Sequence, residues 1–122
     1  MKQVLLDTNF ILTCLRQKID FFEEIPLMGM EIIIPRQVVN EIKKLEDSRE
    51  GAVREEASLS MKLLNRNKFT SVKLRRNNVD RGIIEFAAEN PDVIIATLDK
   101  EIKDNVRNQK MVIRNMKRLE IR

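Results

Sequence analysis

Two short apolar runs, residues 4–6 and 93–96, each lead into polar residues that include an aspartate: Asp7 in the first case and Asp99 in the second. Continuous aliphatic runs of this length predict strands buried on both faces, which is typical of a parallel sheet. Ligands of open α/β sheets bind beyond the carboxyl ends of the strands, so both aspartates are candidate functional residues. An aspartate at such a position also caps the following helix, and for each residue taken alone both interpretations stay open.

The remaining pattern alternates strands with amphipathic helices. Further strands are predicted at 31–34, 69–74 and 111–113, and helices at 9–22, 36–47, 52–65, 80–89 and 99–108. Segment 69–74 has the weaker alternation of an edge strand. The order β-α-β-α-α-β-α-β-α-β predicts an α/β fold, a three-layer α/β/α sandwich with a mostly parallel sheet of about five strands. At 122 residues, we expect one domain spanning 1–122.

The composition excludes several kinds of chemistry. The chain has no His, so it cannot use a Ser-His or Cys-His nucleophile or build the usual zinc site. The single cysteine, Cys14, lies in an apolar segment and is predicted to be a core residue. With no Trp or Tyr and five Phe, an RNA reader based on aromatic stacking is not expected. Carboxylates are the main acid-base and ligand groups that remain.

Charge and targeting features give broader expectations. The net charge of +4 and the pI near 9.4 permit binding to a polyanion, with basic residues spread along the chain. No segment resembles a signal peptide or is long enough to cross a bilayer, so no membrane association is expected. Together with the single cysteine, this predicts a cytoplasmic protein in a reducing compartment.

Asp80 is an acid on the inner face of a predicted helix. At 100° per residue it falls within the apolar stripe formed by Ile83, Ile84 and Ala87. An aspartate in the first turn is also favoured by the helix dipole, so a purely structural role is an equal alternative.

Glu41 and Glu46 both lie beside the apolar stripe of the 36–47 helix. Glu41 is the better candidate because it is five residues, about 7.5 Å of helix, nearer to the end of the preceding strand. Asp104, by the same projection, points away from the apolar face of its helix and is interpreted as solvated.

Four acids gathered at one sheet edge would repel one another unless cations lay between them. Carboxylate oxygens without His suit Mg²⁺ or Mn²⁺, which keep several waters and bind phosphates. Such ions lower the pKa of a bound water and stabilise a leaving oxygen. Hydrolysis of a nucleic-acid backbone is therefore the leading hypothesis.

Four segments, 5–9, 35–42, 79–87 and 95–103, together resemble the PIN-domain ribonucleases and occur in that family's order. The resemblance implies a five-stranded parallel sheet and a metal-dependent endoribonuclease that uses Mg²⁺ or Mn²⁺. It implies that Asp7, Glu41, Asp80 and Asp99 are catalytic metal ligands, with Asn9 and Thr97 as polar support. Homodimers are frequent in the family. The family often has a second acid directly after the third one, and here that position is Arg81, which would alter the number of metal ions or add a phosphate contact.

Other functions and partners stay open at this point. A phosphate-accepting domain or phosphatase also uses an aspartate at a strand end, but its second aspartate is replaced here by Asn9. A catalytically silent PIN-like module that binds RNA or a protein is the main alternative. The partners expected from the resemblance are RNA and an antitoxin or ribosome-maturation protein. Arg36, Arg81 and Lys100 adjoin the motifs and are candidate phosphate contacts, or simply solvated charges.

Overall fold

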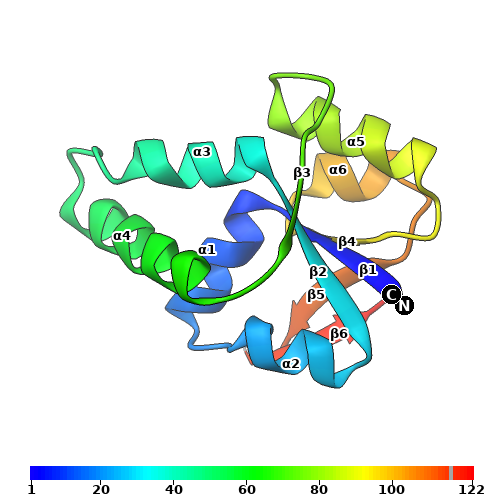
Figure 1. Cartoon of the computed structure of the whole chain (residues 1–122), viewed down its shortest axis with the longest axis horizontal. Coiled ribbons are helices and arrows are strands. Elements are labelled where there is room, and N and C mark those ends of the chain that lie inside the picture. Colours follow the sequence, from blue (N-terminus) through cyan, green and yellow to red (C-terminus); the bar gives the residue numbers. More distant parts are fainter. Residues whose placement is uncertain (116) are drawn as a thin grey trace.

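A six-stranded sheet runs through the middle of the protein in the order β3-β2-β1-β4-β5-β6 (Figure 1). The computed structural model describes residues 1–115 and 117–122. The strands are β1 (Lys2–Leu6), β2 (Met30–Pro35), β3 (Thr70–Val72), β4 (Ile94–Ala96), β5 (Lys110–Arg114) and β6 (Arg118–Ile121). Strands β1 to β5 are mutually parallel, and β6 alone pairs antiparallel, with β5. The prediction of a mostly parallel sheet with β3 at its edge is confirmed.

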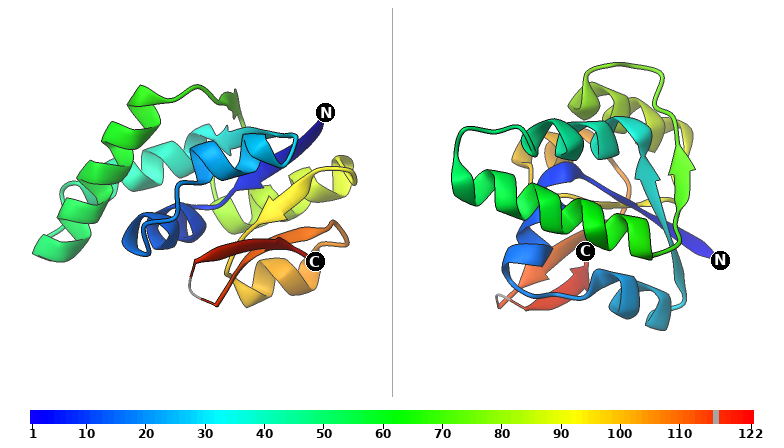
Figure 2. Two further views of the ribbon diagram at one scale, coloured as in Figure 1. Left: turned by 90° about the horizontal axis from the view of Figure 1, so that it is seen from below. Right: turned by 60° about the vertical axis from the view of Figure 1, so that its left-hand side comes forward.

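Helices cover both faces of this sheet. They are α1 (Thr8–Arg16), α2 (Phe21–Leu27), α3 (Arg36–Leu45), α4 (Gly51–Arg66), α5 (Val79–Glu89) and α6 (Lys100–Asn105). Helices α1, α3 and α4 contact one another, and α5 contacts α6, on the other side of the sheet (Figures 1 and 2). The result is the predicted three-layer α/β/α sandwich. In the part of the chain that the structure describes, we find no helix that is both long enough and apolar enough to cross a bilayer.

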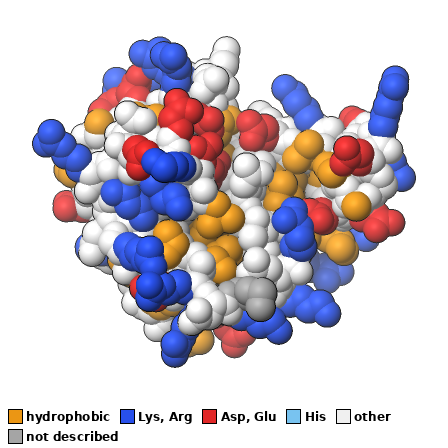
Figure 3. Space-filling model, turned by 180° about the vertical axis from the view of Figure 1, so that it is seen from behind, with side chains coloured by type: hydrophobic (Ala, Val, Ile, Leu, Met, Phe, Trp, Pro, Cys, Tyr) orange, Lys and Arg blue, Asp and Glu red, His pale blue; other side chains and the backbone are white. Residues whose placement is uncertain are grey.

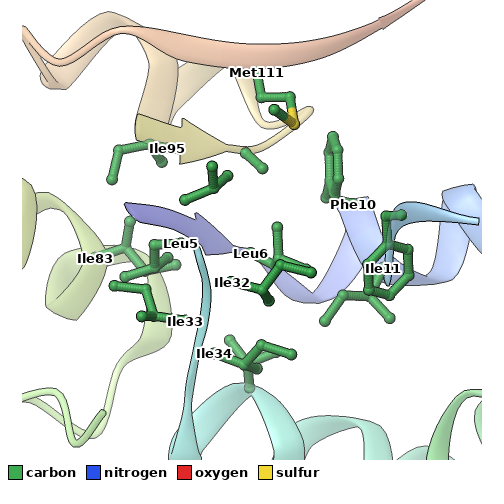
Figure 4. Packing of buried hydrophobic residues seen from close by; sticks show 14 of the residues in the cluster. Leu5, Leu6, Phe10, Ile11, Ile32, Ile33, Ile34, Ile83, Ile95 and Met111 are labelled. Carbon is green, nitrogen blue, oxygen red and sulfur yellow. The ribbon is translucent and has the colours of Figure 1, made fainter. Parts of the chain in front are cut away.

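Strand β1 lies at the centre of the core because both of its faces are covered. Leu5 and Leu6 are fully buried and point to opposite sides of the sheet. Leu5 lies towards Ile83 of α5, whereas Leu6 lies towards Phe10 of α1 (Figure 4). Each such buried leucine contributes roughly 1.5–3 kcal/mol relative to an exposed one. This packing holds the end of β1, and Asp7 directly after it, in a fixed place.

The single helix predicted at 9–22 is wrong, because the chain breaks there into α1 and α2. Lys18 has φ +59°, its N–H donates to the carbonyl of Leu15, and the N–H of Ile19 donates to the carbonyl of Cys14. These two bonds form a Schellman motif, which normally has glycine in the left-handed position. Since the residue here is lysine, the sequence carried no conventional stop signal. Asp20 then caps α2 by accepting a hydrogen bond from the N–H of Glu23.

Strand β6 is the second departure from the prediction, and it raises the strand count from about five to six. It forms a hairpin with β5 in which Arg114 pairs with Arg118. Leu119 is the one buried residue of β6, so its four residues gave too short a pattern to predict a strand.

The amide side chain of Gln37 fixes α3 to the segment that precedes α5. Its N–H donates to the carbonyl of Leu74 at 2.9 Å, and its carbonyl accepts from the N–H of Leu74 at 3.1 Å. Gly82 of α5 packs closely against the same residue, since a Cβ there would lie 3.0 Å from the Cβ of Leu74. Leu74 therefore joins the helix that carries Glu41 to the helix that carries Asp80.

We expect Gln37→Ala to lower the free energy of unfolding by about 1–3 kcal/mol, because it leaves two backbone groups of the buried Leu74 unpaired. Chemical denaturation measures the change. Asn40→Ala, an exposed position on the same helix, is the control and should change stability by about 0.5 kcal/mol or less. Equal stability of the two variants would contradict a bridging role for Gln37.

Candidate active site

Asp7, directly after β1, has a buried carboxylate that accepts two hydrogen bonds and a backbone N–H that donates a third. The parallel pairing of β1 with β4 continues through its N–H, which donates to the carbonyl of Ala96 at 3.0 Å. Its side chain is 4% exposed. One carboxylate oxygen accepts from the N–H of Thr8 at 2.7 Å, which caps α1, and the other accepts from the hydroxyl of Thr97 at 3.0 Å. Asp7 is therefore both a helix cap and part of a polar network between strands.

Thr97 links Asp7 to Asp99. Its buried hydroxyl donates to Asp7 and accepts from the N–H of Asp99 at 3.1 Å. One oxygen of the Asp99 carboxylate accepts from the N–H groups of Glu101 and Ile102, at 2.8 and 3.4 Å, and so caps α6. Asp7 and Asp99, the two aspartates that follow buried strands, are thus linked through Thr97, because β1 and β4 are adjacent and parallel.

Glu41 is exposed on α3 but has a buried partner on α1. The hydroxyl of Thr8 donates to Oε1 of Glu41 at 2.6 Å, and Thr8 itself is 6% exposed. Thr8 lies inside the Asp7-Thr8-Asn9 triplet, but nothing in the sequence alone marked it as a partner of Glu41. Asn9, the member of that triplet taken as polar support, is exposed and has no side-chain hydrogen bond within the described residues.

Asp80 lies half-buried in the first turn of α5. The helix cap is Asn78, whose side chain accepts from the N–H of Arg81 at 3.0 Å, so Asp80 does not cap α5, although its place in the first turn suits the helix dipole. Burial raises the pKa of Asp80, and the nearby carboxylates of Asp99, Glu41 and Glu101 raise it further.

The pKa of Asp7 is also affected by neighbouring acids of the site. Burial raises the pKa of Asp7 from 3.8 to about 6. The hydrogen bonds from Thr97 and Thr8 oppose this rise, whereas the charges of Asp80 and Glu41 add to it. Asp7, Glu41, Asp80 and Asp99 thus interact through space from four separate elements. Glu101, in the first turn of α6, is a fifth acid that the sequence analysis did not weigh.

The acids set aside in the sequence lie elsewhere. Glu46 accepts a hydrogen bond from the hydroxyl of Ser58 at 3.2 Å, between α3 and α4. Asp104 is exposed and forms an ion pair with Lys100 at 2.6 Å. All three candidate phosphate contacts, Arg36, Arg81 and Lys100, are exposed, and Lys100 is paired with Asp104.

The donor chemistry of the site suits a hard cation. Over residues 1–115 and 117–122, no three Asp, Glu or Cys side chains lie close enough as they stand to hold one metal ion together. Asp80, Glu41 and Asp99 nevertheless each have at least one carboxylate oxygen that accepts no hydrogen bond from the described residues. An all-carboxylate set of this kind matches Mg²⁺ or Mn²⁺.

We expect Asp7→Asn to stabilise the metal-free protein at neutral pH. An acid whose pKa is raised on folding costs stability once the pH exceeds its unfolded pKa, and the cost is complete above the folded value near 6. The advantage of Asp7→Asn over wild type should therefore grow between about pH 4 and pH 7, to at most about 3 kcal/mol.

Melting curves in EDTA at several pH values measure this difference, with the exposed Asp92→Asn as the control for loss of one carboxylate. A constant difference between wild type and Asp7→Asn across this pH range would contradict the raised pKa.

The sequence and the structure have known relatives. A family model described as "PIN like domain" matches residues 4–118. The chain is 32% identical to Ribonuclease VapC4 of Methanocaldococcus jannaschii over 127 aligned positions, covering 99% of this chain and 97% of that protein. The solved structure of the PIN domain endonuclease Utp24 superposes with a TM-score of 0.78 at 25% identity, over 98% of this chain and 90% of the other.

A second solved structure, a domain of a functionally unknown protein from Methanocaldococcus jannaschii, shares the fold alone, with a TM-score of 0.57 and 17% identity over 85% of this chain and 83% of that one. The family model, the ribonuclease relative and the shared architecture agree. The chain belongs to the PIN-like domain family.

Proposed function

We propose that this protein is a metal-dependent endoribonuclease that hydrolyses RNA phosphodiester bonds at the carboxyl edge of its sheet. The observation that carries the proposal is that Thr8 and Thr97 join Asp7 to Glu41 and to Asp99 by hydrogen bonds. Asp80 lies near enough to Asp99 and Glu41 for their charges to raise its pKa. The similarity of the chain to Ribonuclease VapC4 and to the endonuclease Utp24 also supports the proposal. A single domain, residues 1–122, would carry the whole site.

The four acids would serve as ligands to Mg²⁺ or Mn²⁺. When bound, such an ion supplies an activated water and stabilises the leaving oxygen of the phosphodiester. The role of the protein side chains is to hold the metal ligands in place before RNA binds. Thr97 and the N–H of Thr8 hold the Asp7 carboxylate, and the Thr8 hydroxyl orients Glu41. The coupling of these acids also means that bound cations would relieve their mutual repulsion.

Arg36, Arg81 and Lys100 are proposed phosphate contacts beside this site. Arg36 and Arg81 are exposed at the starts of α3 and α5. Lys100 would first have to leave Asp104, but an exposed ion pair of this kind is weak because water screens it. Further proposed properties are a cytoplasmic location, a homodimeric state and a protein partner, either an antitoxin or a ribosome-maturation factor.

A catalytically silent module that binds RNA or a protein is the alternative. The presence of Arg81, where the family often has an acid, favours it, since fewer carboxylates would weaken metal binding. RNA binding without cleavage in Mn²⁺ would identify this alternative.

We expect Asp7→Asn and Asp80→Asn each to lower RNA cleavage by about a hundredfold or more, because each removes a charge needed for the metal. The measurement is cleavage of total RNA in Mg²⁺, Mn²⁺ or EDTA, with mapping of the cut ends. Asp92→Asn, an exposed acid outside the site, should cleave like wild type. Full activity of either site variant, or of wild type in EDTA, would refute the proposed mechanism.

We also expect Thr8→Val to weaken Mn²⁺ binding by about tenfold, since it keeps the buried shape but removes the hydrogen bond to Glu41. Thr8→Ser retains a hydroxyl and should bind Mn²⁺ nearly as wild type does. Isothermal titration calorimetry with the metal alone separates this effect from catalysis. Equal affinities for all three proteins would leave Thr8 with only a packing role.

A further inference from the structure

The positive charge of this protein comes from its last twenty residues. Residues 103–122 contain seven Lys or Arg and two Asp or Glu, whereas residues 1–102 contain sixteen Lys or Arg and seventeen Asp or Glu. The basic residues are spread along the chain, but the acids that balance them are nearly absent from this segment. The excess of positive charge is therefore local.

The segment follows the end of α6 and forms β5 and β6, at one edge of the sheet. Five of its basic side chains are exposed and are here named the basic edge: Arg107, Arg114, Lys117, Arg118 and Arg122. Glu120 lies 3.4 Å from Arg114 and 3.7 Å from Arg122, so one carboxylate is shared by two arginines. Arg107, Lys117 and Arg118 have no acidic partner within the part of the chain that is described.

Part of the basic edge lies on the same side of the sheet as the acids. Strand β5 is parallel to β4, and Met111 is level with Ala96, the last residue of β4. From there β5 continues to Arg114, three residues or about 10 Å further in the same direction. Arg114, Lys117 and Arg118 therefore lie on the carboxyl side of the sheet, as Asp7 and Asp99 do. Figure 3 shows Lys and Arg side chains distributed over one face of the molecule, with one group of Asp and Glu side chains near its top and others at its right-hand end.

The chemistry of this surface indicates what it binds. The last aromatic residue of the chain is Phe86, so the basic edge has no ring on which a base could stack. Its contacts would be made by charge to phosphates, without preference for sequence. The acids of the site repel a polyanion, and the balance of charge over residues 1–102 offers no net attraction. The proposed contacts of Arg36, Arg81 and Lys100 lie beside the reacting bond, so RNA that extends beyond them needs attraction from another surface.

We propose that the basic edge binds the phosphate backbone of single-stranded RNA that extends from the active site. This inference rests on the proposed ribonuclease function and adds the surface that holds the substrate outside the reacting bond.

The test is a triple variant, Arg107→Gln, Lys117→Gln and Arg118→Gln, which removes three exposed charges without breaking an ion pair. Its control is Lys62→Gln, Arg66→Gln and Lys68→Gln, three exposed charges on α4 and before β3, at the opposite edge of the sheet. Both variants lose the same net charge. Binding of labelled 30-nucleotide oligo(A) and oligo(U) in EDTA is measured from 50 to 300 mM salt.

We expect the basic-edge variant to bind both RNAs at least about tenfold more weakly at low salt, and to lower the salt slope by about 2, since each phosphate contact to a single strand contributes about 0.7. The control should keep the wild-type slope. An unchanged slope in the basic-edge variant overturns the proposal, even if that variant loses affinity for an acidic peptide or an anionic vesicle. Equal losses in both variants also overturn it, because net charge alone would then explain them.

Cleavage in Mn²⁺ is measured in parallel to separate this inference from the proposed function. Wild type that binds RNA through the basic edge but does not cut it refutes the ribonuclease and supports the surface. Wild type that cuts RNA, with a basic-edge variant that binds and cuts equally well, refutes the surface alone.

Discussion

The buried carboxylate of Asp7 is the constraint on which the site depends. An isolated charge in the core would be strongly unfavourable, so the fold must supply partners for it or leave it neutral. The fold supplies partners, since Thr8 and Thr97 donate hydrogen bonds to the carboxylate. It also favours the neutral form, since burial raises the pKa of Asp7. Thr8 follows Asp7 directly in the chain, but Thr97 is within reach only because β1 and β4 are adjacent, parallel and in the register that pairs Leu6 with Ala96. The site is thus a consequence of the packing of its central strand.

Much of this arrangement could be predicted from the sequence because the periodicities are strong and the strand ends are polar. Helix α3 was expected at 36–47 and runs over Arg36–Leu45, and Asp99 was expected at a helix start and caps α6. The choice of Glu41 over Glu46 rested on distance along the helix. In the structure Glu41 accepts a hydrogen bond from Thr8, the residue next to Asp7, whereas Glu46 accepts one from Ser58; the metal-binding role of Glu41 stays a prediction.

What could not be predicted depended on contacts between distant residues or on unusual residues in familiar conformations. A lysine in a left-handed turn ended α1, where a glycine would have marked the break. The role of Thr8 required knowing that α3 lies beside α1, which periodicity within either helix does not reveal. The four residues of β6 are extended because they pair with β5, a contact that the local sequence pattern does not reveal.

The position of the two chain ends has a practical consequence. Strand β1 begins, and β6 ends, on the amino side of the sheet, where Arg122 exchanges two backbone hydrogen bonds with Lys110 (Figure 1). The side chain of Lys2 reaches Gln109 in the same region, at 2.8 Å. An affinity tag, a fluorescent protein or a tether to a solid support joined at either end would therefore leave from the side remote from Asp7. Such fusions would keep the carboxyl edge open to solvent.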